Sequence, residues 1–283
     1  MTQLGLWIGL PGALREITDG ASAFDRSPDL GVTEFRSLAG GVTTWAPPVR
    51  PRRLKLTWDS MQQDDVQHLD RLARRLDQLG PVALVDPLAR NLLGGAQAAG
   101  LGPSEGKWSV TGTEIILYGG GVTEVTPNVV SVETVPASGH TDLVWRHPYF
   151  HGYPVAPGQT YTWWTPGLDA AGAPMLPARV SWYDASTVFL SESAASTSGR
   201  PAVVTAPPRA AYVRPYVAFT AKGMWGMGES VLALGDVSAA LLAGDRPIGD
   251  GTPPYSITRY SHVASEGDGA YRDISLELVE VTP

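Results

Sequence analysis

Residues 53–79 read RLKLTWDSMQQDDVQHLDRLARRLDQL, and this stretch holds the two patterns that decide the fold of the N-terminal part. In its first six residues polar and apolar side chains alternate, which places Leu54, Leu56 and Trp58 on one face of a β-strand. The remainder has helical spacing, so we expect a helix from about Met61 to Leu79. The stretch therefore predicts a strand followed at once by a helix that covers a sheet.

The expected helix is amphipathic and has start and stop signals. Its apolar stripe consists of Val66, Leu69, Leu72, Leu76 and Leu79. Ser60 and Gln63 have the spacing of a capping box, in which each side chain accepts a hydrogen bond from a backbone N–H that the helix leaves unpaired. Gly80-Pro81 predicts its end. Asp70 and Arg74 are placed to form an i,i+4 ion pair on the other side.

The composition of the whole chain favours β-structure. The 283 residues include 32 Gly and 24 Pro, and 43% are hydrophobic while 17% are charged. High Gly and Pro content together with many Thr, Val and Tyr residues favours short strands joined by tight turns. The fold class that we expect is mainly β, with one helix in an N-terminal domain and an inserted, jelly-roll-like β-sandwich.

Changes in glycine content and in the alternation of apolar residues along the chain predict the domain boundaries. Gly-rich residues follow Leu93, and short strands with turns then succeed one another, which is typical of a β-sandwich. Residues 271–281 again alternate, and we expect Ile274, Leu276 and Leu278 to point into the N-terminal domain, in a strand paired with one from residues 1–58. The predicted domains are 1–92 with 239–283, discontinuous, and 93–238.

Charge and cysteine content limit the function classes. The net charge is −7, and residues 1–92 carry as many acidic as basic residues, so no basic stripe exists for sequence-specific or non-specific nucleic-acid binding. Without cysteine there can be no disulfide, cysteine nucleophile or Cys-based zinc site. No segment has the length and hydrophobicity of a membrane span. The apolar start, with Pro11, reads as a strand rather than a signal peptide.

Three blocks of the sequence resemble a known family. The first runs from Gly40-Gly41 through the strand and helix above to Asp86-Pro87-Leu88-Ala89-Arg90-Asn91-Leu92-Leu93. It is similar to the distal tail (Dit-like) and minor tail proteins of long-tailed phages, especially those of actinobacterial hosts. The middle block, including 155–162, 178–184 and 204–208, resembles the carbohydrate-binding-module-like sandwich of such proteins. Residues 272–281 look like the terminal strand of a tail-tube-like domain.

The resemblance implies a structural role. It implies a ring-forming β domain with one helix, a second β-sandwich carried on it, and a place between tail tube and tail tip. The implied partners are identical copies, in a ring that we expect to be of six, and other tail proteins such as the tail tube, tail hub and tape measure. The protein would be made in the host cytoplasm and reside in the virion tail. The family brings no catalytic, cofactor or metal residues.

Searches for chemical motifs favour the same reading. There is no G-x-S-x-G elbow, P-loop or dinucleotide-binding motif, and Gly119-Gly120-Gly121 fits a hairpin turn. His140, His147 and His151 match no common zinc spacing. The carboxylates considered for glycosidase chemistry or calcium, which we interpret as turn or solvated loop residues, are Asp169, Asp184, Glu192, Asp245, Asp250, Glu266 and Asp268. We therefore expect no enzyme activity.

Two aromatic pairs leave an alternative open. Trp163 with Trp164, and Trp182 with Tyr183, are neighbours in predicted strands, so the members of each pair point to opposite faces. One member of each pair could be exposed and stack on a sugar ring, although core or subunit-interface packing is the commoner role of large aromatic residues. The alternative function is therefore a tail protein that binds host-surface carbohydrate or a receptor. A cell-wall hydrolase is a third hypothesis.

Overall fold

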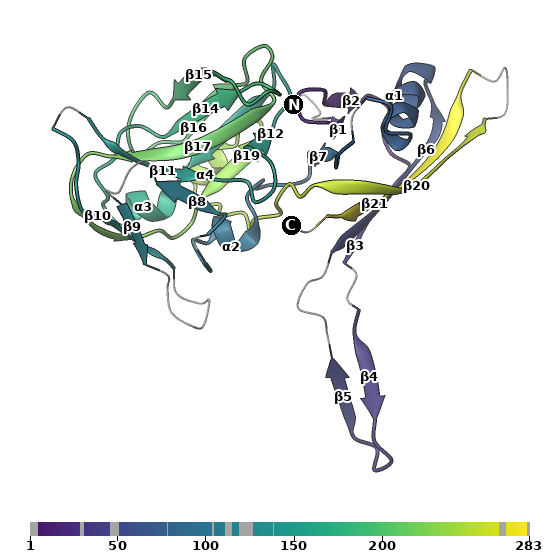
Figure 1. The fold of residues 1–283 in the computed structure, drawn as a ribbon, viewed down its shortest axis with the longest axis horizontal. Helices are drawn as coiled ribbons and strands as arrows, with labels where there is room; N and C mark the ends of the chain where they lie inside the picture. The colour runs from purple at the N-terminus through teal and green to yellow at the C-terminus, as the bar shows by residue number, and fades with distance from the viewer. Residues whose placement is uncertain are drawn as a thin grey trace. The chain divides into compact units, whose positions relative to one another are not determined.

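The structure is a computed structural model that describes residues 5–28, 31–45, 51–77, 79–103, 105–110, 115–118, 127–137, 139–265 and 270–281. It is mainly β, as the composition predicts, with several antiparallel sheets (Figure 1). The chain forms two compact units. The larger comprises Met1–Glu16 and Ala83–Thr252, and the smaller comprises Ile17–Val82 and Pro253–Pro283.

The smaller unit is built on a four-stranded antiparallel sheet. Its strand order is β20 (Tyr255–Ala264), β21 (Arg272–Glu280), β6 (Arg52–Met61) and β3 (Ala23–Pro28). As predicted, the last strand pairs with the alternating strand of the opening stretch: Leu276 is opposite Leu56 and Leu278 is opposite Leu54. These four leucines and Ile274 are buried, so the two strands share one apolar face.

Helix α1 (Gln63–Ala73) packs against β20 and β21 and is shorter than predicted at both ends. The capping box is wrong: β6 continues to Met61, Ser60 adopts φ 59°, and its N–H donates to Asp273 Oδ1 at 2.9 Å. The N-cap residue, Gln62, makes no side-chain capping bond. The chain therefore passes from strand to helix with no capping turn at Ser60.

The C-terminal end of α1 explains why two predicted core leucines are exposed. Arg75 adopts φ 55°, and its N–H donates to Leu72 O at 3.1 Å, while Leu76 N–H donates to Arg71 O at 3.1 Å. This pattern is the Schellman motif with an arginine at the left-handed position that glycine usually takes. The helix therefore ends before Leu76 and Leu79, which are 60% and 78% exposed. The predicted Asp70–Arg74 ion pair is present at 3.0 Å.

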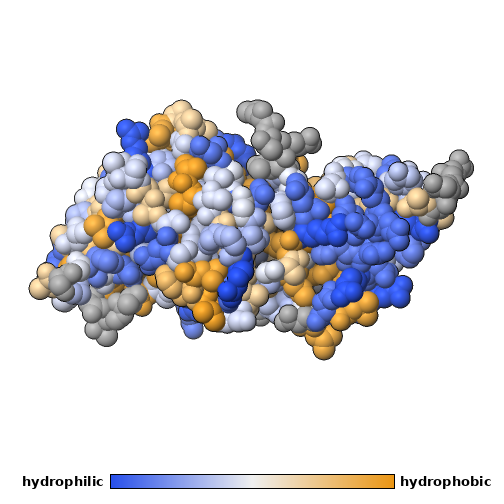
Figure 2. Space-filling model, turned by 90° about the horizontal axis from the view of Figure 1, so that it is seen from above, coloured by the Kyte–Doolittle hydropathy of each residue, from blue (hydrophilic) through white to orange (hydrophobic). Residues whose placement is uncertain are grey.

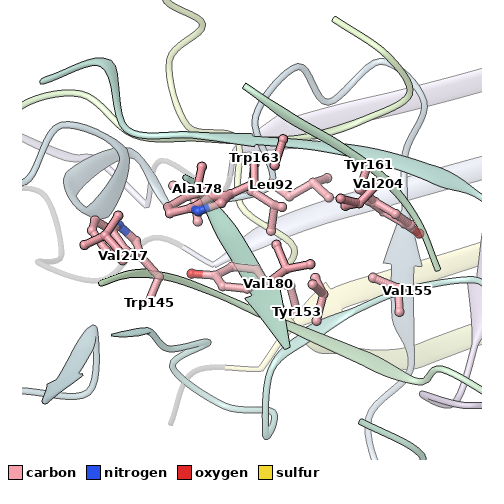
Figure 3. Close-up of a cluster of buried hydrophobic side chains, with 14 of the residues drawn as sticks. Leu92, Trp145, Tyr153, Val155, Tyr161, Trp163, Ala178, Val180, Val204 and Val217 are labelled. Carbon is pink, nitrogen blue, oxygen red and sulfur yellow. The ribbon is translucent and has the colours of Figure 1, made fainter. Parts of the chain in front are cut away.

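The larger unit places two main sheets around one hydrophobic core. One has the order β15 (Phe189–Ala194), β14 (Arg179–Tyr183), β17 (Tyr212–Phe219), β11 (Thr141–Trp145) and β8 (Trp108–Val110), with β12 (Tyr153–Pro154) also paired to β17. The other has the order β16 (Ala202–Thr205), β13 (Thr160–Trp164) and β19 (Val231–Leu234). Figure 3 shows side chains from both sheets meeting in this core. Trp145 and Trp163 meet edge to face, with ring centroids 5.1 Å apart.

Smaller elements accompany the two main sheets. One three-stranded sheet has the order β2 (Arg15–Ile17), β1 (Leu6–Gly9) and β7 (Ala83–Val85), and another has the order β18 (Gly223–Gly226), β10 (Val129–Val132) and β9 (Ile115–Tyr118). Three short helices are α2 (Gly95–Ala98), α3 (Pro166–Ala170) and α4 (Ser238–Leu242). Within the described ranges α1 is the longest of four helices, and the other three lie in the larger unit.

The unit boundaries differ from those that the sequence predicts. Residues 1–16, 83–92 and 239–252 belong to the larger unit rather than to the discontinuous N-terminal domain. Asn91 explains much of this shift: its buried amide donates to Ser230 O at 2.9 Å and to Pro247 O at 3.2 Å, and its Oδ1 accepts from Leu93 N and Leu232 N. The Gly-rich stretch after Leu93 is thus held inside the larger unit and is not a linker.

Candidate functional site

The two edge strands of the smaller unit's sheet are the most prominent candidate for an interaction site. Among the described residues, β3 pairs with β6 alone. Strand β20 pairs with β21 along its length and otherwise makes one bridge, between Tyr255 and Val82. Within the part of the chain that the structure describes, β20 and β3 are therefore the outer strands of this sheet. Such edges are templates for pairing with another chain.

The two faces of this sheet differ in chemistry. The face toward α1 holds the buried side chains of Leu54, Leu56 and Trp58 from β6. Helix α1 covers it with Val66, Leu69 and Leu72, and the Tyr260 hydroxyl of β20 donates to Val66 O at 3.4 Å. The opposite face carries the polar members of each alternating strand, such as Lys55 and Glu277. The sheet is therefore covered on one face and polar on the other.

Polar contacts fix β6 and β21 to each other at both ends. Arg52 donates from Nε to Glu280 Oε2 at 3.1 Å, and its backbone N–H donates to the same oxygen at 3.0 Å. At the other end, Ser60 N–H is held by Asp273. The central pair of strands is thereby anchored, which gives the edges a defined geometry.

The second candidate surface is the hairpin of β4 (Thr33–Arg36) and β5 (Val42–Trp45) (Figure 1). Every residue from 31 to 45 is exposed. The register places Phe35 and Trp45, 58% and 56% exposed, on one face of the ribbon. Leu38 at its turn is fully exposed. A two-stranded hairpin without a covered face is marginally stable in water, so this one is suited to being covered by a partner.

The turn of this hairpin is well defined. Ser37 N–H donates to Gly41 O at 2.8 Å, and Gly40 N–H donates back to Ser37 O at 2.9 Å. Ser37 Oγ also accepts from Gly41 N–H at 3.0 Å. Gly40 adopts φ 83°, which favours glycine. Both faces of this hairpin are exposed, which its sequence pattern does not indicate.

Three of the four aromatic residues considered for sugar binding are buried. Trp163 and Trp182 lie in the main core with no exposed surface. Trp164, on the other face of β13, is covered by a separate cluster that includes Leu241 of α4. Both faces of β13 are therefore filled, which the alternation alone does not reveal. Tyr183 alone is partly exposed, on the outer face of β14.

Tyr183 lies among aromatic and basic side chains. The ring centroid of His151 is 4.7 Å away and that of Phe189 is 5.9 Å away, and the Arg214 guanidinium lies 5.5 Å from the centre of the Tyr183 ring. Burial lowers the pKa of His151, and the charges of Arg214 and Arg146 lower it further. Phe189 is 52% exposed, so this cluster offers some aromatic surface to solvent.

His147 serves the structure of the larger unit. Its Nδ1 accepts hydrogen bonds from the backbone N–H groups of Tyr149 and Phe150, at 3.1 and 2.9 Å, so the ring proton is on Nε2, which donates to Thr252 O at 2.9 Å. Burial lowers its pKa to about 4. The ring is therefore neutral near neutral pH and joins residues that are distant in sequence.

The remaining titratable candidates are in turns or local pairs. His140 lies 3.4 Å from Asp142, whose pKa is raised by burial. Asp184 accepts from Ser186 N–H and Val188 N–H and pairs with Arg209, which is the turn role that the sequence predicts. Burial raises the pKa of Asp169, which accepts from Trp164 Nε1.

The other acidic candidates are dispersed. Asp245 pairs with Arg90, Asp250 accepts from Arg90 N–H, and Glu192 is an exposed residue of β15. Glu266, Asp268 and Gly119-Gly120-Gly121 lie outside the described residues. In the described part of the chain, no group of three or more His, Asp or Glu side chains is placed to hold a metal ion.

Comparisons with known proteins add no family to these observations. The chain matches no protein-family model, and no curated protein matches its sequence. Among the residues that the structure describes, no helix combines the length and apolar character needed to cross a membrane. The function must therefore be argued from the geometry of the edges, the hairpin and the larger unit.

Proposed function

We propose that this chain is a non-enzymatic structural subunit of a phage tail tip, of the distal tail or minor tail kind. In this proposal six identical copies close into a ring that joins the tail tube to the tip complex. The smaller unit forms the ring, and the larger unit, which we propose to be a jelly-roll-like sandwich, is carried on it. Its partners are then the tail tube, tail hub and tape measure proteins of the virion.

The observation that carries the proposal is the four-stranded sheet of the smaller unit, with β20 and β3 as its edge strands. Its central strands come from residues 52–61 and 272–280 and are anchored to each other, while β20 and β3 are the outer strands on opposite sides. Proteins usually avoid exposed edges because they promote aggregation. A closed ring uses both edges of each copy, so no edge remains exposed after assembly.

The hairpin supports the same proposal. Phe35, Trp45 and Leu38 expose large apolar side chains on a ribbon that has no covering element within the described residues. A lone two-stranded hairpin is marginally stable in water, and a covering partner would stabilise it. In an assembly the apolar face of the arm is buried against a neighbouring tail subunit.

Labelling of virions tests the proposed location. An antibody against the purified protein is expected to bind at the distal end of phage tails in electron micrographs. A Trp45→Ser protein serves as the assembly-defective control. Because Trp45 is exposed, its replacement should leave the fold intact but weaken incorporation into tails. Label on capsids, or on no part of the virion, contradicts the proposal.

One observation favours a second candidate function, binding of host-surface carbohydrate. Tyr183 and the exposed ring of Phe189, beside Arg214, form an aromatic surface on the larger unit. Such rings can stack on a sugar. A glycan array probed with the wild type and with Phe189→Ser tests this candidate, and binding that is absent or insensitive to the substitution removes it.

A further inference from the structure

An aromatic row crosses three strands on the outer face of the larger unit's main sheet. Tyr212 of β17 is opposite Tyr183 of β14, and Tyr183 is opposite Phe189 of β15. The ring centroids of Tyr183 and Phe189 are 5.9 Å apart, and Phe189 is 52% exposed. Trp182 and Val213, which alternate with the tyrosines, are buried in the core, so the aromatic row faces outward.

Arg214 adds a positive charge to the aromatic row. It lies two residues beyond Tyr212 on β17 and therefore on the same face. Its guanidinium carbon is 5.5 Å from the centre of the Tyr183 ring, which is within the range of a cation–π contact. Within the part of the chain that the structure describes, no carboxylate pairs with Arg214, and its Nε is buried without a hydrogen-bond partner. A guanidinium has five N–H donors, so Arg214 retains donors for a group outside the chain.

The carboxylates in the neighbouring strands have partners of their own. Asp184, at the end of β14, forms an ion pair with Arg209 at 2.9 Å. Glu192 of β15 is separated from Arg214 by a residue of β14, and it accepts a hydrogen bond from the Tyr216 hydroxyl. The positive charge of Arg214 is therefore not neutralised by either of them.

His151 packs against this surface and responds to its positive potential. Its ring centroid lies 4.7 Å from that of Tyr183, in an edge-to-face contact. Burial lowers the pKa of His151, and the charges of Arg214 and Arg146 lower it further. The loop is held close to β17 at Gly152, where an added Cβ would lie 2.9 Å from Arg214 Cγ. The aromatic row and Arg214 are thus fixed by packing and lie in a positive potential.

This combination of groups selects among classes of ligand. Aromatic rings stack on sugar rings, and a guanidinium without an ion pair binds a carboxylate or phosphate through two parallel hydrogen bonds. Figure 2 shows hydrophobic residues directly beside hydrophilic ones on the visible side of the larger unit. The three strands of the aromatic row span two strand spacings, about 10 Å, which leaves room for two linked sugar rings. Nucleic acid is disfavoured, because the chain has a net charge of −7 and no basic stripe.

We propose that the aromatic row with Arg214 binds an acidic glycan, a polysaccharide whose sugar rings carry a carboxylate or phosphate group. Sugar rings stack on Tyr183 and Phe189, and Arg214 holds the negative group. This inference rests on the second candidate function and deepens it, because it names the chemical class of the glycan and the residue that reads its charge. It does not depend on formation of a ring.

A glycan array built from matched pairs tests the class of ligand. The full-length protein is applied to uronate oligosaccharides and to their methyl esters, which keep the rings but lose the charge. Phosphate-bearing glycans and their dephosphorylated counterparts form a second set, so the two sets distinguish carboxylate from phosphate recognition. The acidic member of a pair should bind at least about tenfold more tightly, as expected for hydrogen bonds to a charged group.

Variants of the full-length protein test the site. Arg214→Gln should bind the acidic and neutral members of a pair alike, whereas Arg214→Lys, which keeps a long stem and the charge, should retain part of the preference. Phe189→Ser should weaken binding of both members, because it removes a stacking surface and no charge. Arg200→Gln is the control, since this exposed arginine follows the opposite end of β15 from Phe189, and it should change neither affinity.

The outcomes separate this inference from the functions proposed above. Equal binding of acidic and neutral glycans by the wild type overturns the inference but leaves the second candidate function standing. Absence of binding to every glycan overturns both. A preference for acidic glycans that survives Arg214→Gln shows that the charge is read elsewhere and overturns the site. Binding to polyglutamate as tight as to the uronate oligosaccharides shows that charge alone is recognised and overturns the glycan class.

Discussion

Replacing Leu276 with alanine tests whether the C-terminal strand is part of the core of the smaller unit. Leu276 has no exposed surface and lies between Leu56 of β6 and Tyr260 of β20. Helix α1 covers the same face. Because neighbours on several sides restrict collapse of the cavity, the loss should lie near the middle of the range for buried leucines, about 3–4 kcal/mol.

Hydrogen exchange is the appropriate assay, because it reports the two units separately. Peptides that cover β6 and β21 should lose protection in Leu276→Ala, while peptides from β13 and β17 should not change. Leu76→Ala is the matched control: its side chain is 60% exposed beyond the end of α1, so its effect should be within about 0.5 kcal/mol. Protection of β6 that is unchanged in Leu276→Ala would refute the placement of this strand.

Three further predictions concern the two units. The pKa of His147 in the folded protein is about 4, below its ordinary 6.5, so the stabilisation that neutral His147 gives the larger unit should be complete above pH 6.5. The free energy of unfolding should fall by up to about 3 kcal/mol as the pH is lowered toward 4. A denaturation series that shows no such loss, or the same loss in His147→Gln, contradicts this role. Asn91→Ala should lower the free energy of unfolding, measured by heat or denaturant, by about 2–4 kcal/mol, because several buried partners lose their hydrogen bonds. An unchanged free energy of unfolding would show that other contacts hold residues 245–252. A chain of residues 17–82 joined by a short Gly/Ser linker to 253–283 should fold alone, since Val82 and Tyr255, next to the joined ends, exchange backbone hydrogen bonds of 2.8 and 2.9 Å. A circular dichroism spectrum typical of a disordered chain would contradict the unit boundaries.

The sequence predicts the central strands of the smaller unit well. Strict alternation in residues 53–58 and 271–281 identifies both strands and their buried faces, because a half-buried strand leaves a period of two in the sequence. It also predicts that they pair, although more than two hundred residues separate them.

The helix shows where local signals fail. Ser60 and Gln63 have the spacing of a capping box. In the structure, however, Ser60 still belongs to β6, and its N–H donates a hydrogen bond to Asp273 Oδ1 of the neighbouring strand. At the other end, Arg75 adopts the left-handed conformation that sequence rules assign to Gly80. In both places a contact outside the local pattern, or a residue type that rarely takes that conformation, determines the boundary.

The aromatic candidates and the unit boundaries depend on tertiary structure. Alternation correctly places Trp163 and Trp164 on opposite faces of β13, but it does not show that α4 and its neighbours bury the second face. Likewise, Gly94 and Gly95 suggest a flexible stretch in the sequence. The four hydrogen bonds of Asn91 that hold this region cannot be recognised there, because three of them are made to residues 230, 232 and 247, which are far away in the sequence.

Electron microscopy of the purified full-length protein tests the central claim, closure of the smaller units into a ring, most directly. Class averages at high protein concentration should show a closed ring with a central channel and the larger units attached to it. Monomers in solution, together with a lone copy in the virion, would contradict the claim.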